Sequence, residues 1–169
     1  GEKCLEGFCE LFPQADVYTL IYAPERLSTV VNSMNICASR LSDIPRIDRI
    51  YRYCLPLFPR LIESFDLRNY DVIVSSSHCV AKGIFPHRAP HIAYIHAPMR
   101  YVWDMHNAYF GGDGSLLARI GMSVWRRYLQ RWDVAASERV DYFLANSRNV
   151  AAKIHKLYGR KATVIHPPV

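Results

Sequence analysis

The chain has 169 residues, and half of them are apolar, which is enough for one hydrophobic core of ordinary size. No apolar run reaches the roughly 18 residues needed to cross a bilayer. Five cysteines without a CxxC pair predict neither a disulfide framework nor a zinc site, and we expect a reducing compartment. A formal net charge of +6 leaves three anionic partners open: nucleic acid, a phospholipid surface or a phosphate-bearing small molecule.

Five short segments rich in β-branched and aromatic residues alternate with helical stretches along the chain. They end at Tyr22, Ser77, His96, Ser147 and Pro168. Such alternation predicts an α/β fold, namely a Rossmann-like parallel sheet with helices on both faces, in one domain. The carboxyl ends of its strands share one edge, and open α/β folds bind ligands at that edge.

Hydrophobic periodicity predicts three longer helices, over about residues 2–12, 115–138 and 148–158. The third has good N-cap chemistry in Asn146 and Ser147 and a C-cap glycine in Gly159. In the second, periodicity assigns one set of residues to the apolar face and an arginine set to the opposite, solvated face. These two sets are Leu117, Ile120, Val124, Tyr128, Trp132 and Ala135, and Arg119, Arg126 and Arg127.

The stretch between residues 25 and 67 is less regular, because helical spacing is interrupted by Pro45, Pro56 and Pro59. Several short helices broken by these prolines would satisfy the pattern. The stretch is too long for a simple crossover, so we expect an insertion that shapes a binding face.

Polar side chains follow the predicted strands, at the expected ligand edge. They are Ser75, Ser76, Ser77 and His78, then His96, then Asn146 and Ser147, and finally His166. A serine nucleophile is disfavoured because the GxSxG elbow is missing. Three of the histidines could meet at the strand ends, but no carboxylate accompanies them in sequence, so we predict no metal.

Phosphate-binding signals are sparse in this sequence. The GxGxxG fingerprint is missing, and GGDG at 111–114 follows an aromatic segment rather than a strand, so it predicts a flexible loop. Gly1 and Glu2 open the first helix, where backbone N–H groups and the helix dipole can approach a phosphate. A plain N-cap glycine explains the same two residues.

The densest group of candidate residues is the segment 96–104, HAPMRYVWD. His96 leaves a buried strand, a proline fixes the turn, and Arg100, Tyr101, Trp103 and Asp104 follow. Aromatic faces, guanidinium forks and carboxylates are the mixture that binds sugar rings and phosphates. An equally good explanation is a helix start with aromatic packing and an Arg100 to Asp104 ion pair.

Several longer motifs carry a resemblance to a known family. In order, they are GEK, ELFPQADVYTLIY, DVIVSSSHCVAKG, YIHAPMRYVWD, RRYLQRWDVAASERVDYFLANSRNVAAKIHKLYGR and ATVIHPPV. Together they resemble the retaining GT-B glycosyltransferases of family 4, in particular bacterial mannosyltransferase-like members. The resemblance covers most of the chain and thins out over residues 25–65.

The resemblance implies roles for matching positions. Gly1 and Glu2 are similar to the end of a Gly-Gly-x-Glu loop that approaches the donor diphosphate, and His96 to a histidine that hydrogen-bonds a donor-sugar hydroxyl. A larger set of residues would contact the acceptor or the sugar. Two of them, Asn146 and Ser147, also match the asparagine and serine that begin the last helix of this domain in the family. That set is Ser76, Ser77, His78, Arg100, Tyr101, Trp103, Asp104, Asn146 and Ser147.

By the same resemblance, residues 1–169 are the N-terminal, acceptor-side domain without its first strand, and the nucleotide-sugar-binding C-terminal domain is missing. The implied partners are a nucleotide-sugar donor and a glycan or polyprenyl-diphosphate-linked acceptor, with no nucleic acid, no cofactor and no metal. We expect a cytoplasmic protein with peripheral contact to the inner face of the plasma membrane. Two alternatives stay open: a non-catalytic module for an anionic or lipid-linked partner, and another GT-B enzyme such as a sugar-nucleotide epimerase.

Overall fold

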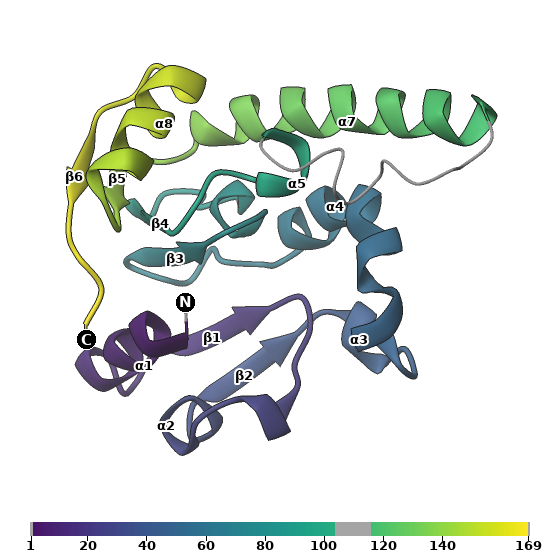
Figure 1. The fold of residues 1–169 in the computed structure, drawn as a ribbon. Coiled ribbons are helices and arrows are strands. Elements are labelled where there is room, and N and C mark those ends of the chain that lie inside the picture. Colours follow the sequence, from purple (N-terminus) through teal and green to yellow (C-terminus); the bar gives the residue numbers. More distant parts are fainter. Residues whose placement is uncertain (1, 104–115, 169) are drawn as a thin grey trace. The chain divides into compact units, whose positions relative to one another are not determined.

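A computed structural model describes residues 2–103 and 116–168 of the chain (Figure 1). The chain divides into two compact units, Gly1–Phe65 with Pro167–Val169, and Asp66–His166. Each contains a parallel sheet, so the described strands form two sheets where the sequence predicted one. The difference comes partly from a strand at residues 35–38, NICA, which is too short to show an alternating pattern. Among the described residues, no helix combines the length and hydrophobicity needed to cross a membrane.

The first unit begins with α1 (Glu2–Leu11), followed by β1 (Asp16–Thr19). Strand β2 (Asn35–Ala38) pairs with β1 in parallel, in a register that sets Asp16 opposite Asn35. Between the two strands lie η1 (Pro24–Arg26) and α2 (Thr29–Asn32), and the hydroxyl of Ser28 caps α2 by accepting from the Val31 N–H.

Short helices fill the rest of this unit. They are η2 (Arg40–Asp43), α3 (Ile47–Ile50), η3 (Tyr51–Leu57) and α4 (Phe58–Glu63). Pro56 lies inside η3, and Pro59 lies in the first turn of α4, where a missing N–H costs nothing. The prediction of several short helices broken by prolines is therefore confirmed.

The second unit contains four parallel strands in sequential order. They are β3 (Ile73–Ser77), β4 (His91–Ile95), β5 (Tyr142–Ala145) and β6 (Ala162–Val164). The register sets Ser76 opposite Tyr94 and Leu144 opposite Thr163. All four carboxyl ends therefore share one edge, as expected from the sequence.

Helices η4 (Ala81–Gly83), α5 (Arg100–Trp103), α7 (Leu116–Ser137) and α8 (Arg148–Tyr158) complete the second unit, and α7 and α8 can be followed in Figure 1. The predicted caps of α8 are confirmed: the Ser147 hydroxyl accepts from the Val150 N–H, and Gly159 has a φ of 66°. The sheet and α8 share an apolar core. Its buried members are Ala93, Ile95, Val140, Phe143, Ala145, Val150 and Ile154.

The predicted faces of α7 are wrong for Val124, Tyr128 and Arg126. They are right for Trp132, which is half-buried and packs against η4, and for Arg127, which is exposed. Val124 and Tyr128, assigned to the apolar face, are 62% and 39% exposed. Arg126, assigned to the solvated face, is half-buried and donates from Nε to the Val102 carbonyl at 3.1 Å. The helix instead buries Leu129 and Asp133, because a polar cluster described below holds Asp133 inside the unit. Apolar periodicity could not predict that the buried face of α7 contains the carboxylate of Asp133.

Candidate functional site

A serine and a histidine meet at the carboxyl edge of the four-stranded sheet. Ser76 is the penultimate residue of β3, and its Oγ is 2.9 Å from Nε2 of His96, the first residue after β4. The His96 N–H donates to the Ser77 carbonyl at 2.9 Å, and its ring packs edge-on against Tyr94 with 5.0 Å between centroids. Backbone, hydroxyl and aromatic contacts therefore fix the position of the imidazole.

The His96 ring is neutral at physiological pH. It is half-buried, and the loss of solvent lowers its pKa to about 4. Among the residues that the structure describes, Nδ1 of this ring has no hydrogen-bond partner, whereas Nε2 is held by Ser76. The serine hydroxyl can donate or accept, so the second nitrogen can present either a donor or an acceptor to a ligand.

Asn146 connects this pair to the next two strands. Its side-chain Nδ2 donates to the His96 main-chain carbonyl at 3.0 Å. The main-chain carbonyl of Asn146 lies 3.2 Å from Nδ1 of His166, which follows β6. Ser147 donates to the Asn146 side-chain oxygen at 3.0 Å while it caps α8. The structure thus brings Ser76, His96, Asn146, Ser147 and His166 into one hydrogen-bonded group, which we call the edge group.

Ser77 and His78 do not join the edge group. Ser77 is buried, and its Oγ accepts from the Lys82 N–H at 3.4 Å, because strand alternation turns it to the face opposite Ser76. His78 is exposed in the turn that follows β3. Within the described ranges, no cluster of three or more His, Cys, Asp or Glu side chains could hold a metal ion.

The segment after His96 runs into α5. Met99 and Val102 are fully buried and anchor it, whereas Arg100 is exposed at the first position of the helix. The indole N–H of Trp103 is directed inward and donates to Oδ2 of Asp133 on α7 at 2.8 Å. Two other members of the predicted sugar-binding set, the Tyr101 side chain and Asp104, lie outside the described residues.

Side chains of α7 hold α5 in place by hydrogen bonds to the carbonyl of Val102. The Val102 oxygen accepts from Nε of Arg126 at 3.1 Å and from Nε2 of Gln130 at 3.0 Å. With the bond between Trp103 and Asp133, three side chains of α7 hold the segment that begins at His96.

A buried ion pair, missed by the sequence analysis, organises this region. Nζ of Lys82 lies 2.8 Å from Oδ1 of Asp133 and donates to the Asp133 carbonyl at 2.7 Å, and both side chains are essentially inaccessible to solvent. Oδ2 of Asp133 accepts from Trp103 and, at 2.8 Å, from the Tyr158 hydroxyl. Burial lowers the pKa of Lys82 and raises that of Tyr158. The only sequence signal was one acidic residue among the apolar and basic residues of α7.

A close approach next to the ion pair explains Gly83. A Cβ at this position would collide with the Trp132 ring, which packs against the backbone of η4. The Lys82 ammonium lies 5.8 Å from the centroid of that ring and 4.8 Å from that of Tyr158. The cation is thus enclosed by aromatic faces as well as by its carboxylate.

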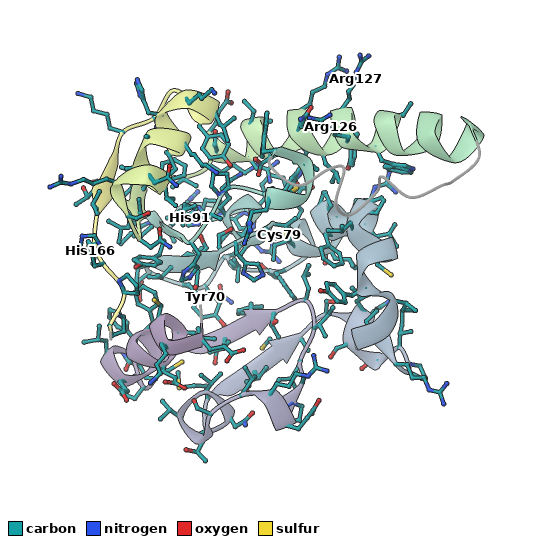
Figure 2. All side chains as sticks on the ribbon, in the orientation of Figure 1. Tyr70, Cys79, His91, Arg126, Arg127 and His166 are labelled. Carbon is teal, nitrogen blue, oxygen red and sulfur yellow. The ribbon has the colours of Figure 1, made fainter. Side chains whose placement is uncertain are left out.

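A second serine–histidine pair, also missed, lies in the core of the same unit. The side chain of His91, labelled in Figure 2, is fully buried. Its Nε2 lies 2.9 Å from Ser75 Oγ, and its Nδ1 lies 3.0 Å from the Arg139 carbonyl. A carbonyl only accepts, so Nδ1 carries the proton and Nε2 accepts from Ser75. Burial lowers the pKa of His91, and the ring is a neutral structural element.

Glu2 belongs to the first unit, where it is exposed at the start of α1. It lines a cavity of about 200 Å³ together with Thr19 and Arg26, and apolar residues of α1, α2 and both strands complete the wall. Gly1 lies outside the described residues, so the predicted diphosphate contact of Gly1 and Glu2 stays a prediction.

A parallel α/β unit that gathers hydroxyl, imidazole and amide groups at the carboxyl edge of its strands has a Rossmann-like fold, and folds of this class bind ligands at that edge. The sequence profile of Glycosyltransferase Family 4 matches residues 2–169. The chain therefore belongs to glycosyltransferase family 4, and we describe it as a glycosyltransferase domain. Searches of curated proteins and of solved structures gave no match.

Proposed function

We propose that this chain is the N-terminal, acceptor-side domain of a retaining GT-B hexosyltransferase. In the full enzyme it would help to transfer mannose from GDP-mannose to a glycan or a polyprenyl-diphosphate-linked acceptor in bacterial surface polysaccharide synthesis. The observation that carries the proposal is the edge group, in which Ser76 and Asn146 hold His96 at the ligand edge of a family 4 domain.

His96 would position the donor sugar rather than attack it. Its ring is neutral because of the lowered pKa, and Nε2 is already bound to Ser76, so Nδ1 is the atom offered to a sugar hydroxyl. A neutral imidazole hydrogen-bonds a hydroxyl without placing a positive charge beside the cationic sugar of the transition state. Precise placement of this kind lowers the barrier because the reacting groups are already oriented.

The reaction would be completed by a second, nucleotide-binding domain. The bond between the anomeric carbon and the diphosphate oxygen breaks, and a bond to the acceptor oxygen forms on the same face of the sugar. The acceptor proton passes to the departing diphosphate, whose negative charge needs electrostatic stabilisation. Gly1 and Glu2 would approach that diphosphate, and Arg100 is exposed where a guanidinium could bind acceptor hydroxyls or phosphates.

The proposal is tested by incubating full-length enzyme with labelled GDP-mannose or UDP-sugars and with lipid-linked acceptors. We expect mannosyl transfer with retained configuration at the anomeric carbon, measured by NMR of the product, and a rate that EDTA leaves unchanged. Hydrolysis or epimerisation without transfer would point to the other GT-B chemistry, and no reaction with any donor would favour a binding module.

The role of His96 has its own test in the same enzyme. We expect His96→Ala to lower kcat by about 10²-fold, because an oriented contact to the donor sugar is lost. His155→Ala is the matched control, since His155 is an exposed histidine on α8. A wild-type rate in His96→Ala would remove this residue from the site.

A further inference from the structure

The outer side of α7 carries a stripe of apolar and aromatic side chains. Val124, Trp125, Tyr128 and Val134 are 62%, 45%, 39% and 36% exposed, and they recur over about three turns of the helix. The Trp125 and Tyr128 rings pack edge to face, with 5.8 Å between their centroids. Single exposed hydrophobic residues are ordinary, but several gathered on one helix indicate an interaction surface.

The stripe is held outward by the opposite side of the same helix. Asp133 is completely buried there and bonds to Lys82, Trp103 and Tyr158, while Leu129 packs beside it. Turning α7 to bury the stripe would pull this carboxylate away from all three partners. A buried charge that loses its partners is strongly destabilising. The exposed face is therefore a fixed feature of the unit.

Positive charge accompanies the stripe. Arg127 and Arg131 are both exposed, one turn apart, and Figure 2 shows Arg127 projecting away from the helix. Glu138 follows only after the last turn of α7, and Asp133 is neutralised inside by Lys82. Val124, Trp125, Arg127, Tyr128, Arg131 and Val134 together form what we call the α7 outer face.

We propose that the α7 outer face docks on the surface of an anionic lipid bilayer. Trp and Tyr rings are suited to the boundary between head groups and acyl chains, and guanidinium groups bind lipid phosphates. A second copy of the chain fits less well, because the arginines of two such faces would repel each other. Nucleic acid fits less well because valines lie within the stripe. The choice of lipid thus follows from charge complementarity and from the aromatic content.

The α7 outer face lies next to the segment that follows His96. Arg131 and Val134 line an open hollow of about 390 Å³ together with Trp103, the last residue of α5. Helix α5 directly follows the turn that begins at His96. The inference deepens the proposed function and rests on it in one respect: a bilayer at α7 would present a lipid-linked acceptor to this segment.

Vesicle co-sedimentation of the full-length protein tests the docking. We expect binding to vesicles of phosphatidylcholine with roughly one third phosphatidylglycerol, and weak binding to phosphatidylcholine alone. Replacing Arg127 and Arg131 by Gln should weaken binding on the order of 10- to 30-fold, at about 1 kcal/mol per arginine. Trp125→Ser with Tyr128→Ser should weaken it on both kinds of vesicle. Lys156→Gln with Lys161→Gln removes the same charge from exposed positions outside α7 and should change binding little.

Two controls separate the possible failures. Each variant should keep its urea midpoint, since all the altered side chains are exposed, and each should keep its transfer rate toward a water-soluble acceptor. Equal vesicle binding by wild type and both α7 variants would overturn the docking and leave the proposed function standing. A change of oligomeric state in the α7 variants, without an effect on vesicles, would overturn it in favour of a second copy. Loss of transfer in the wild type would overturn the proposed function alone.

Discussion

Two serine–histidine pairs in this domain have the same side-chain distance and opposite surroundings. Ser75 and His91 are 2.9 Å apart in the core, and Ser76 and His96 are 2.9 Å apart at the carboxyl edge of the sheet. The other nitrogen of His91 donates to the Arg139 carbonyl, whereas in the described part of the chain that of His96 has no such partner. Residue type and distance do not distinguish structure from function here, but the remaining hydrogen-bonding capacity does.

The strand register explains why neighbouring serines take different roles. Ser75 lies opposite Ala93, which places His91 two residues before its partner position, and Ser76 lies opposite Tyr94, which places His96 two residues after it. Residues two apart share a face of the sheet, so each serine reaches a histidine on its own face. One of these contacts falls at the amino end of β4 and the other beyond its carboxyl end. Only the second is at the edge where ligands bind.

The largest effect should come from the buried polar groups. We expect Lys82→Met to lower the free energy of unfolding by about 3–5 kcal/mol, because it leaves the Asp133 carboxylate buried without its cation. Urea unfolding monitored by circular dichroism measures the change. Lys156→Met, at an exposed position of α8, is the control and should lose little stability. A loss below about 1 kcal/mol for Lys82→Met would show that water or rearrangement compensates the charge.

Replacing the core histidine should reduce stability and spare catalysis. We expect His91→Leu to cost about 1–3 kcal/mol, since the Ser75 hydroxyl and the Arg139 carbonyl lose their partner. The transfer rate per folded molecule should match that of the wild type when the full enzyme is assayed well below its melting temperature. A fall in kcat with unchanged stability would reverse the roles that we assign to the two pairs.

The two serines offer a smaller version of the same contrast. Ser76→Ala should reduce kcat by about 5- to 10-fold, the effect of roughly one neutral hydrogen bond, because the His96 ring loses its anchor. Ser75→Ala should leave kcat unchanged and cost about 1 kcal/mol of stability. Paired kinetic and urea measurements on both variants decide the matter, and similar kinetic losses in the two would contradict the distinction.

Sequence reasoning found the elements with strong local signals. The helix over 148–158 has a capping serine and a terminal glycine, and both act as predicted. The strands at the edge group were placed because β-branched runs end in polar residues. Their shared edge followed from parallel topology, and the structure joins five of the predicted strand-end residues there, namely Ser76, His96, Asn146, Ser147 and His166.

The failures involve information that is not local in sequence. Lys82 and Asp133 are 51 positions apart, and only the folded unit shows that each neutralises the other. Because that ion pair requires Asp133 to be buried, Val124 and Tyr128 on the other side of α7 are exposed, although the apolar periodicity had assigned them to the core. Strand β2 was missed because four residues give too short a pattern to identify.

We also expect the stability of the domain to depend on pH. Burial lowers the pKa of His91, and loss of solvent lowers that of His96 to about 4, so both rings are neutral in the folded state near pH 7. The unfolded chain takes up these protons near pH 6.5, so below that value it binds more protons than the folded protein does. The free energy of unfolding should therefore fall with decreasing pH, by up to about 1.4 kcal/mol per pH unit for His91 and by less for the half-exposed His96, whose charge solvent screens, until the folded pKa is reached.

Urea midpoints at about pH 7.5, 6.5 and 5.5 measure this dependence, in a range where most carboxylates stay ionised. His91→Leu should flatten the curve because one of the histidines with a lowered pKa is gone. An equally steep curve in His91→Leu would mean that His91 is not held neutral by burial. The core pair would then resemble the edge pair in its access to solvent, and the contrast between them would have to rest on kinetics alone.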